Sequence, residues 1–283
     1  MKKLLFIEIF VLSTFLYIGL ASKAQANNMR VVSIDGSITE IIYALDMQSA
    51  LVGVDTTSRY PDEAIDLPKV GYMRQLSAEG ILSLNPSLII ATDEAGPSEV
   101  LEQLKVAGLE VVIIDNDTSL NGVYEKVRTI ASLLKAEAKG EKIIKGLQAN
   151  INQMTEQLNE KRWVSPPRVM FLLAAGSHGT MIAGKNTQAD AMISLMGGIN
   201  VASEFNSYKP LTPEGAVQVL PDIIVIADTR GNANVLDSFE LLKYTPAAQN
   251  NRIVQADSML LLGFGPRIDK AMSTMAPAFY VSR

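Results

Sequence analysis

The sequence contains no cysteine and only one histidine, His178. Without cysteine the chain has no disulfide, no thiolate metal site, no cysteine nucleophile and no lipid attached to an N-terminal cysteine. One histidine is too few for the multi-histidine clusters that bind zinc or iron. Both kinds of metal site are therefore excluded.

An excess of positive charge and low-complexity tracts are also missing. The 283 residues carry a formal net charge of −5, and the pI is about 5.1. This balance argues against nucleic acid or an anionic membrane as a partner. Hydrophobic residues make up 48% and aromatic residues 6%, which is ordinary for a soluble globular protein. The length suits one large domain or two modest ones.

The N-terminus has the pattern of a targeting segment. Lys2 and Lys3 precede an apolar run over residues 4–20, and the small residues of an Ala-x-Ala site follow at 24–26. A membrane anchor is the alternative, because the run is nearly long enough to span a bilayer. Glu8 interrupts that run, so we predict a signal peptide over residues 1–26 and export of the mature chain to the periplasm.

Short β-rich runs alternate with helical patterns along the rest of the chain. Such alternation predicts an α/β fold with parallel sheets covered by helices on both faces. The expected strands are 30–34, 51–54, 88–91, 111–114, 168–173, 223–227 and 252–256, and the expected helices include 39–45, 98–107, 120–134 and 187–196.

One expected helix, from residue 137 to about residue 161, is longer than a crossover between strands requires. At 1.5 Å per residue it is roughly 35 Å long. We therefore predict an N-terminal α/β lobe over residues 27–135, a connecting helix over 136–163 and a C-terminal α/β lobe over 164–283. Ligands of open parallel sheets bind beyond the carboxyl ends of the strands, so a ligand cleft is expected between the lobes.

A stretch of the first lobe is repeated in the second. Residues 76–90 and 211–225 match almost position for position, and the match pairs Glu79 with Glu214 and Pro86 with Pro221. In the first copy Ser77 is the expected N-cap of a short helix. An acid at a helix N-terminus can simply stabilise that helix. A matched acid on each lobe instead predicts electrostatic docking at two points on one partner.

Tyr72 and Arg74 have no counterpart in the second copy. They follow Gly71 in a loop at the carboxyl edge of the first predicted sheet, and residues i and i+2 share a face in an extended segment. A nearby guanidinium favours a phenolate over a phenol. Phenolate oxygen binds ferric iron, and tyrosine is an axial ligand in some haem proteins. The alternative is a tyrosine that only packs at the domain edge.

An enzyme is the competing hypothesis from another class. Ser177 and His178 are the only candidate serine–histidine pair, and neighbours on a loop rarely reach the geometry of nucleophilic catalysis. No Gly-x-Gly-x-x-Gly or Walker loop opens a helix. We therefore predict a binding protein and retain a two-lobed α/β enzyme as the alternative.

Three segments carry a resemblance to a known family: VGYMRQLSAEGILSL at 70–84, AGKNTQADAM at 183–192 and GFGPR at 263–267. With them, essentially the whole mature chain resembles the periplasmic haem-binding proteins of bacterial ABC haem importers. The resemblance implies that Tyr72 is the axial ligand to haem iron and that Arg74 donates a hydrogen bond to it. It also implies that Glu79 and Glu214 dock onto arginines of the permease dimer.

Other candidate ligand contacts each have two interpretations. His178 is either a second iron ligand, as in some haem-binding relatives, or a solvated loop histidine. Arg230 and Arg267 either pair with haem propionates, because guanidinium matches carboxylate, or form structural ion pairs. Tyr60 is the alternative iron ligand.

Together these observations predict a monomeric, exported haem-capture protein that delivers haem to an inner-membrane ABC permease. A carrier of a ferric siderophore or cobalamin is the alternative within the same fold. Tyr72 argues against that alternative, because those ligands need no phenolate on the metal.

Overall fold

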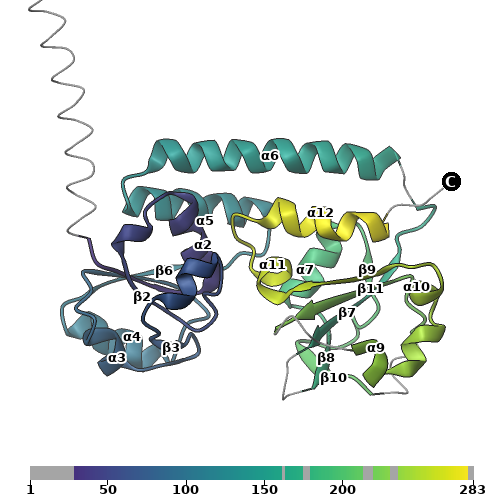
Figure 1. Ribbon diagram of the computed structural model, residues 1–283, viewed down its shortest axis with the longest axis horizontal. Helices are drawn as coiled ribbons and strands as arrows, with labels where there is room; N and C mark the ends of the chain where they lie inside the picture. Colours follow the sequence, from purple (N-terminus) through teal and green to yellow (C-terminus); the bar gives the residue numbers. More distant parts are fainter. Residues whose placement is uncertain (1–28, 161–162, 175–178, 213–218, 230–234, 280–283) are drawn as a thin grey trace, which may run out of the picture. The chain divides into compact units, whose positions relative to one another are not determined.

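The computed structural model describes residues 29–160, 163–174, 179–212, 219–229 and 235–279 (Figure 1). The chain divides into two compact units. The first unit contains Met1–Asp115 and Thr129–Glu137, and the second contains Asn116–Arg128 and Ala138–Arg283. The predicted N-terminal segment, 1–26, lies outside the described residues. Within the described part, no helix has both the length and the apolar character to cross a membrane.

The first unit is built on a four-stranded parallel sheet with the order β2-β1-β5-β6. Strands β1, β2 and β5 are buried on both faces, as is usual for parallel sheets, whereas the edge strand β6 is more exposed. Its elements are β1 (Val31–Ile34), α2 (Gly36–Ala44), η1 (Gln48–Ala50), β2 (Leu51–Val54), η2 (Asp62–Asp66), β3 (Gly71–Tyr72), β4 (Gln75–Leu76), α3 (Ala78–Leu82), β5 (Leu88–Thr92), α4 (Ser98–Val106) and β6 (Glu110–Ile114).

Helix α2 begins three residues earlier than the sequence pattern predicted. Asp35 is its N-cap, and one carboxylate oxygen accepts hydrogen bonds from the Ser37 backbone N–H at 2.7 Å and from the Ser37 hydroxyl at 2.6 Å. Such a cap satisfies a backbone donor that the helix itself leaves unpaired. Residues 35–37, expected to end the strand, therefore also start the helix.

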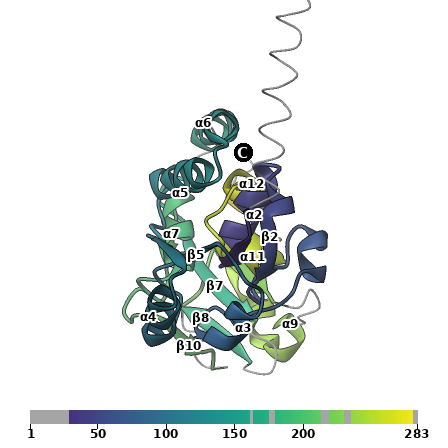
Figure 2. The same ribbon diagram turned by 90° about the vertical axis from the view of Figure 1, so that its left-hand side faces the viewer.

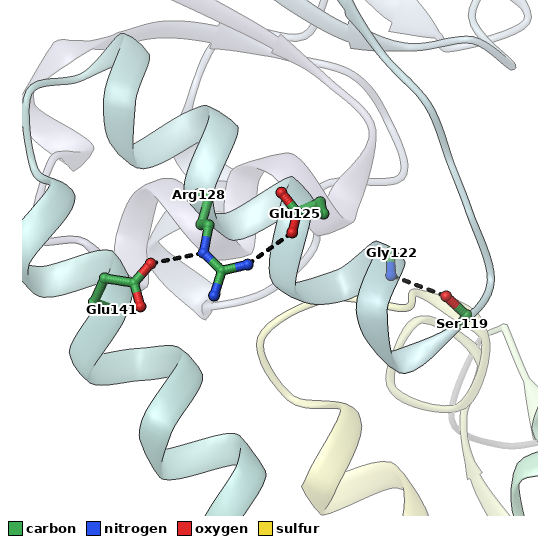
Figure 3. Close-up of polar contacts among 5 residues, drawn as sticks. All are labelled: Ser119, Gly122, Glu125, Arg128 and Glu141. Carbon is green, nitrogen blue, oxygen red and sulfur yellow. Dashed lines mark hydrogen bonds and ion pairs between the residues drawn. The ribbon is translucent and has the colours of Figure 1, made fainter.

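Two helices follow the first sheet: α5 (Leu120–Leu133) and α6 (Glu137–Glu160). Ser119 caps α5 by accepting a hydrogen bond from the Gly122 backbone N–H at 2.9 Å. Arg128 on α5 donates to Glu125 on its own helix and to Glu141 on α6, both at 2.7 Å (Figure 3). Arg128 thus joins the two helices by one guanidinium.

The second unit has a six-stranded sheet in the order β10-β8-β7-β11-β12, with β9 paired to β7 (Figures 1 and 2). Strands β9, β7, β11 and β12 are parallel, and β8 and β10 add an antiparallel edge that the sequence did not indicate. Its elements are β7 (Arg168–Ala174), β8 (Thr180–Ala183), α7 (Gln188–Leu195), β9 (Ile199–Asn200), β10 (Tyr208–Pro210), β11 (Ile223–Asp228), α9 (Val235–Ser238), η4 (Glu240–Tyr244), α10 (Pro246–Gln249), β12 (Ile253–Asp257), α11 (Ser258–Leu262) and α12 (Ile268–Phe279).

The central strands of this sheet are apolar on both faces. In β7, Val169 and Phe171 pack into a core with α6, α7 and α12, whereas Met170 and Leu172 pack into a second core on the other face. All four side chains are fully buried. The α/β fold class predicted from the alternating pattern is therefore confirmed.

The repeated stretch has the same backbone feature in both units. Asn85 and Leu220 occupy equivalent positions, each has a positive φ, 46° and 39°, and each precedes a proline. Asparagine tolerates this left-handed conformation, but leucine is strained there because of its Cβ. The described parts of the two copies around Asn85 and Leu220 therefore share a local backbone conformation.

We predict that Leu220→Asn stabilises the protein by about 1 kcal/mol, because it relieves the left-handed strain. The leucine is 58% exposed, so the change sacrifices little buried surface. Urea unfolding gives the free energy directly. The reverse change, Asn85→Leu, is the control and should destabilise by a similar amount. A lower unfolding midpoint for Leu220→Asn would contradict the assignment of strain.

Candidate ligand-binding site

Tyr72 lies on a small antiparallel hairpin formed by β3 and β4. Tyr72 pairs with Gln75, and Met73 and Arg74 form the two-residue turn. Gly71 has a φ of +101°, which a glycine adopts without strain. Met73 is buried in the core of the first unit, whereas the Tyr72 side chain is 39% exposed. The hairpin therefore exposes the phenol of Tyr72, while the buried side chain of Met73 anchors the hairpin in the core.

Backbone hydrogen bonds fix this hairpin to the loops on either side. The Gly71 carbonyl accepts from the Thr56 N–H at 2.9 Å, and the Met73 carbonyl accepts from the Gly96 N–H at 2.9 Å. The Gly96 carbonyl in turn accepts from the Leu76 N–H at 2.9 Å. Loops that follow β2 and β5 at the carboxyl edge of the sheet are thereby tied to the segment that carries Tyr72.

Arg74 places its guanidinium on the Tyr72 phenol. Its Nη1 donates a hydrogen bond to the Tyr72 Oη at 2.9 Å, and its Nη2 pairs with a carboxylate oxygen of Glu94. The two residues meet across a turn and not along an extended strand as expected from their spacing. Partial burial lowers the pKa of Arg74, but the interactions with Tyr72 and Glu94 outweigh it and raise that pKa.

This arrangement suits a hard, electron-poor metal that arrives with its other ligands in place. The Tyr72 side chain is partly exposed, and Arg74 is a cation at any physiological pH, so a positive charge lies beside the phenol oxygen. Among the described residues, no group of three or more histidine or acidic side chains forms a site for a bare metal ion. The hairpin offers one phenol oxygen, and a tyrosine oxygen can serve as an axial ligand of a metal that a macrocycle already holds.

Glu94 was missed in the sequence. It lies in the loop directly after β5, and its side chain is 28% exposed. The signal was its position at the carboxyl end of a parallel strand, next to Asp93, in a loop already expected at the ligand edge. Sequence spacing did not show that this loop lies beside the hairpin, because the two are joined by tertiary contacts: the Arg74–Glu94 pair and the hydrogen bonds of Gly96.

Tyr60, the alternative metal ligand, lies on the loop after β2 and is 41% exposed. The loop is held by the buried side chain of Asp55 and by the exposed Lys69. Asp55 is fully buried and accepts hydrogen bonds from Thr57 and Ser58 at 2.7 to 2.9 Å. Lys69 donates to the Ala64 carbonyl at 2.7 Å, and burial lowers its pKa, although Asp55 and Asp66 oppose that effect. Tyr60 therefore stays an alternative.

The acid predicted to dock onto a partner is exposed in the first unit. Glu79 is in the first turn of α3, and the Ser77 hydroxyl caps this helix by accepting from the Gly80 N–H at 3.5 Å. The predicted cap is thus present. Glu214, its counterpart, lies outside the described residues, as do His178 and Arg230. The docking role of Glu79 and Glu214 and the ligand contacts of His178 and Arg230 therefore stay predictions.

Arg267 is half-buried at the start of α12, where its carbonyl accepts from the Ala271 N–H at 2.9 Å. The loop before it is held by Lys126 of α5, which is 1% exposed and donates to the Phe264 carbonyl at 3.3 Å and to the Asn116 side chain at 2.6 Å. The sequence analysis overlooked Lys126, although helical spacing from the buried Val123 places it on the apolar face.

The segment at 183–192 contains the turn between β8 and α7 and the first residues of α7. Thr187 caps α7 by accepting from the Asp190 N–H at 3.1 Å, and its hydroxyl donates to the Gly184 carbonyl at 2.9 Å. A Cβ on Gly184 would lie 2.3 Å from the carbonyl oxygen of Phe205. These residues therefore hold the turn between β8 and α7 together.

The chain is similar to known proteins over most of its length. The family model of periplasmic binding proteins matches residues 31–260. Among solved structures, the chain is similar to the periplasmic haem-binding protein RhuT from Roseiflexus sp. RS-1 in apo form, with 39% identity and a TM-score of 0.80 over 89% of this chain and 98% of that one. It is also similar to the periplasmic haem-binding protein HutB of Vibrio cholerae, with 35% identity and a TM-score of 0.75 over 89% of this chain and 99% of that one. Among curated proteins, the vitamin B12-binding protein of Pectobacterium atrosepticum is 28% identical over 210 residues, which are 73% of this chain and 74% of that protein.

Proposed function

Because the chain belongs to the periplasmic binding protein family, we propose that it captures haem in the periplasm and delivers it to an ABC importer of the inner membrane. Members of this family act outside the cytoplasm as binding proteins and not as enzymes. We also propose that the signal peptide is cleaved after Ala26, that the mature protein is a monomer, and that its lobes, 27–135 and 164–283, are joined by a helix over 136–163.

The observation that carries the proposal is the hydrogen bond from Arg74 to the phenol oxygen of the exposed Tyr72, at 2.9 Å. In the proposed complex the Tyr72 oxygen is the axial ligand of ferric haem, and Arg74 steadies that oxygen. Similarity to haem-binding proteins at 35% and 39% identity supports the same ligand. His178 remains the proposed second ligand, and Arg230 and Arg267 remain proposed contacts of the propionates.

Cobalamin is the second candidate ligand, because a vitamin B12-binding protein is among the relatives. Titration distinguishes the two. Trp163 is the only tryptophan, and both ligands absorb light, so saturable quenching of its fluorescence reports either one. We expect ferric haem to quench and to give the absorption spectrum of a high-spin phenolate complex, whereas cyanocobalamin leaves the fluorescence unchanged. Saturable quenching by cyanocobalamin alone would overturn the proposal.

We predict that Glu94→Gln weakens haem binding about two- to fivefold. Glu94 restrains Arg74, but the pair is partly exposed, and such ion pairs contribute about 0.5–1 kcal/mol. The measurement is a haem titration followed by absorbance. Glu102→Gln is the matched control, because Glu102 is exposed and pairs with Lys105 on α4. Equal affinities of the two variants would contradict a role for Glu94 in holding Arg74.

A further inference from the structure

The guanidinium of Arg74 joins the proposed iron ligand to a carboxylate. Its Nη1 donates to the Tyr72 oxygen at 2.9 Å, and its Nη2 pairs with a carboxylate oxygen of Glu94. One positive and one negative charge therefore lie next to each other beside the phenol oxygen, and their sum is zero. The charge that Arg74 presents to this oxygen is offset by Glu94.

Glu94 is held in this place by the fold of the first unit. Its loop directly follows β5, and the Gly96 N–H and carbonyl in this loop both bind the hairpin that carries Tyr72, each at 2.9 Å. The side chain of Glu94 is 28% exposed, compared with 66% for Glu102 in its pair with Lys105 on α4. A less exposed charge is screened less by water and salt, so Glu94 acts on its surroundings more strongly than a surface acid does.

The charge of a metal porphyrin on Tyr72 depends on the charge of the metal. The porphyrin ring is a dianion when it holds a metal, and the oxygen of a bound tyrosine contributes one further negative charge. With a trivalent metal these charges sum to zero, whereas with a divalent metal the complex keeps one negative charge. The propionates carry the same charge in both cases, so only the metal changes the charge beside Arg74.

The charges around the oxygen can distinguish these two complexes. A guanidinium without its carboxylate partner would attract the negative complex of a divalent metal and would do little for the neutral complex of a trivalent metal. A carboxylate beside the guanidinium weakens that attraction. Glu94 therefore removes an advantage that Arg74 alone would give to the divalent metal.

We propose that Glu94 is a specificity-determining residue, which makes the site prefer porphyrins of a trivalent metal, such as ferric haem, over those of a divalent metal, such as ferrous haem. The proposal rests on the proposed function, in which Tyr72 binds the haem iron. Glu94 does not bind haem itself but acts by offsetting the charge of Arg74. The periplasm is an oxidising compartment, so ferric haem is the form expected there.

The test uses two porphyrins that differ in a metal whose oxidation state is fixed: gallium(III) and zinc(II) protoporphyrin IX. Each is titrated into the protein, and the ratio of the two dissociation constants measures the preference for the trivalent metal. Glu94→Gln should lower the preference for gallium about three- to tenfold, as expected for one partly screened charge near the metal. Arg74→Gln should raise it by a similar factor, because the negative charge of Glu94 is then unopposed.

The double variant Arg74→Gln with Glu94→Gln separates charge from packing. Both charges are gone, so the preference should return to within about twofold of the unchanged protein, even though the affinity for each porphyrin falls. Glu94→Asp keeps the charge and should stay closer to the unchanged protein than Glu94→Gln does. Glu102→Gln is the matched control, because it removes an acid that forms an exposed pair with Lys105, and it should leave the preference unchanged.

The midpoint potential of bound haem gives an independent readout. A charge that favours the complex of ferrous iron raises this potential, so it should rise in Glu94→Gln and fall in Arg74→Gln. A substitution that only loosens the hairpin would not shift the potential in opposite directions.

The outcomes separate this inference from the function on which it rests. If ferric haem gives no phenolate-type spectrum with the unchanged protein, the proposed function fails and the inference fails with it. If that spectrum is present but Glu94→Gln has the same gallium preference as the unchanged protein, the inference is wrong and the function stands. Shifts of the preference in the same direction in Glu94→Gln and Arg74→Gln would show that the pair only holds the hairpin, and would also overturn the selection by charge.

Discussion

Tyr72→Phe is expected to lower haem affinity by at least about 100-fold and to remove the phenolate-type spectrum. The substitution removes one oxygen and retains the ring, so packing of the hairpin is preserved. Loss of residues that merely orient a metal ligand typically costs 10- to 100-fold in affinity, so loss of the ligand itself should cost at least the upper part of that range. Absorbance titration with ferric haem measures both the affinity and the spectrum.

Tyr60→Phe is the matched control for this result. Tyr60 is 41% exposed and Tyr72 39% exposed, both in the first unit, so the two variants remove the same atom from equally accessible rings. Only Tyr72 has an Arg74 guanidinium on its oxygen. A normal spectrum for Tyr72→Phe, with loss of the spectrum in Tyr60→Phe, would transfer the ligand role to Tyr60 and remove the main support for the proposed function.

Arg74 is expected to have a smaller effect on haem affinity than Tyr72. Its hydrogen bond holds the Tyr72 oxygen in one place, so less conformational freedom is lost when that oxygen binds iron. A cation on that oxygen also withdraws electron density, which weakens donation to iron. The two effects oppose each other, and this explains why Arg74 is expected to tune the site whereas Tyr72 is expected to be required.

The sequence predicted the fold where local pattern and tertiary packing agree. Apolar runs such as the one that forms β5 are buried on both faces, so composition alone identified them. The sequence pattern did not predict strands β8 and β10, because these strands, Thr180–Ala183 and Tyr208–Pro210, are short and only partly buried. An antiparallel edge of this kind depends on its neighbour β7 and has little signal of its own.

In the site too, contacts between residues close in sequence were predictable, and contacts made by the tertiary fold were not. Tyr72 and Arg74 are two residues apart, so their proximity was accessible from sequence. Glu94 and Lys126 reach their partners Arg74 and Phe264 over 20 and 138 residues, and only the folded chain brings them together. Chemistry within one turn is thus readable from the sequence, whereas the residues that hold it in place are found by structure.

The largest effect on transport is expected from Glu79→Ala combined with Glu214→Ala. Haem affinity should remain at the value of the unchanged protein, and import by an ABC importer reconstituted in proteoliposomes should be lost. Glu79 is exposed on α3, the helix that follows the hairpin of Tyr72, so its replacement is expected to change the surface charge and to leave the hairpin intact. Each single variant should retain import with a raised half-maximal concentration, since the other acid still binds.

Salt dependence provides the sharper criterion for this docking. Contacts between exposed charges are screened by salt, with a Debye length of about 10 Å at 0.1 M. Import by the unchanged protein should therefore weaken as salt rises, and each single variant should show a shallower dependence, because it has one charge pair fewer. Glu102→Ala and Glu240→Ala are the controls, since both carboxylates are exposed and paired with a lysine on their own helix. Loss of haem affinity in the double glutamate variant would show that these acids serve the ligand site, and an unchanged salt dependence would show that docking does not depend on their charge.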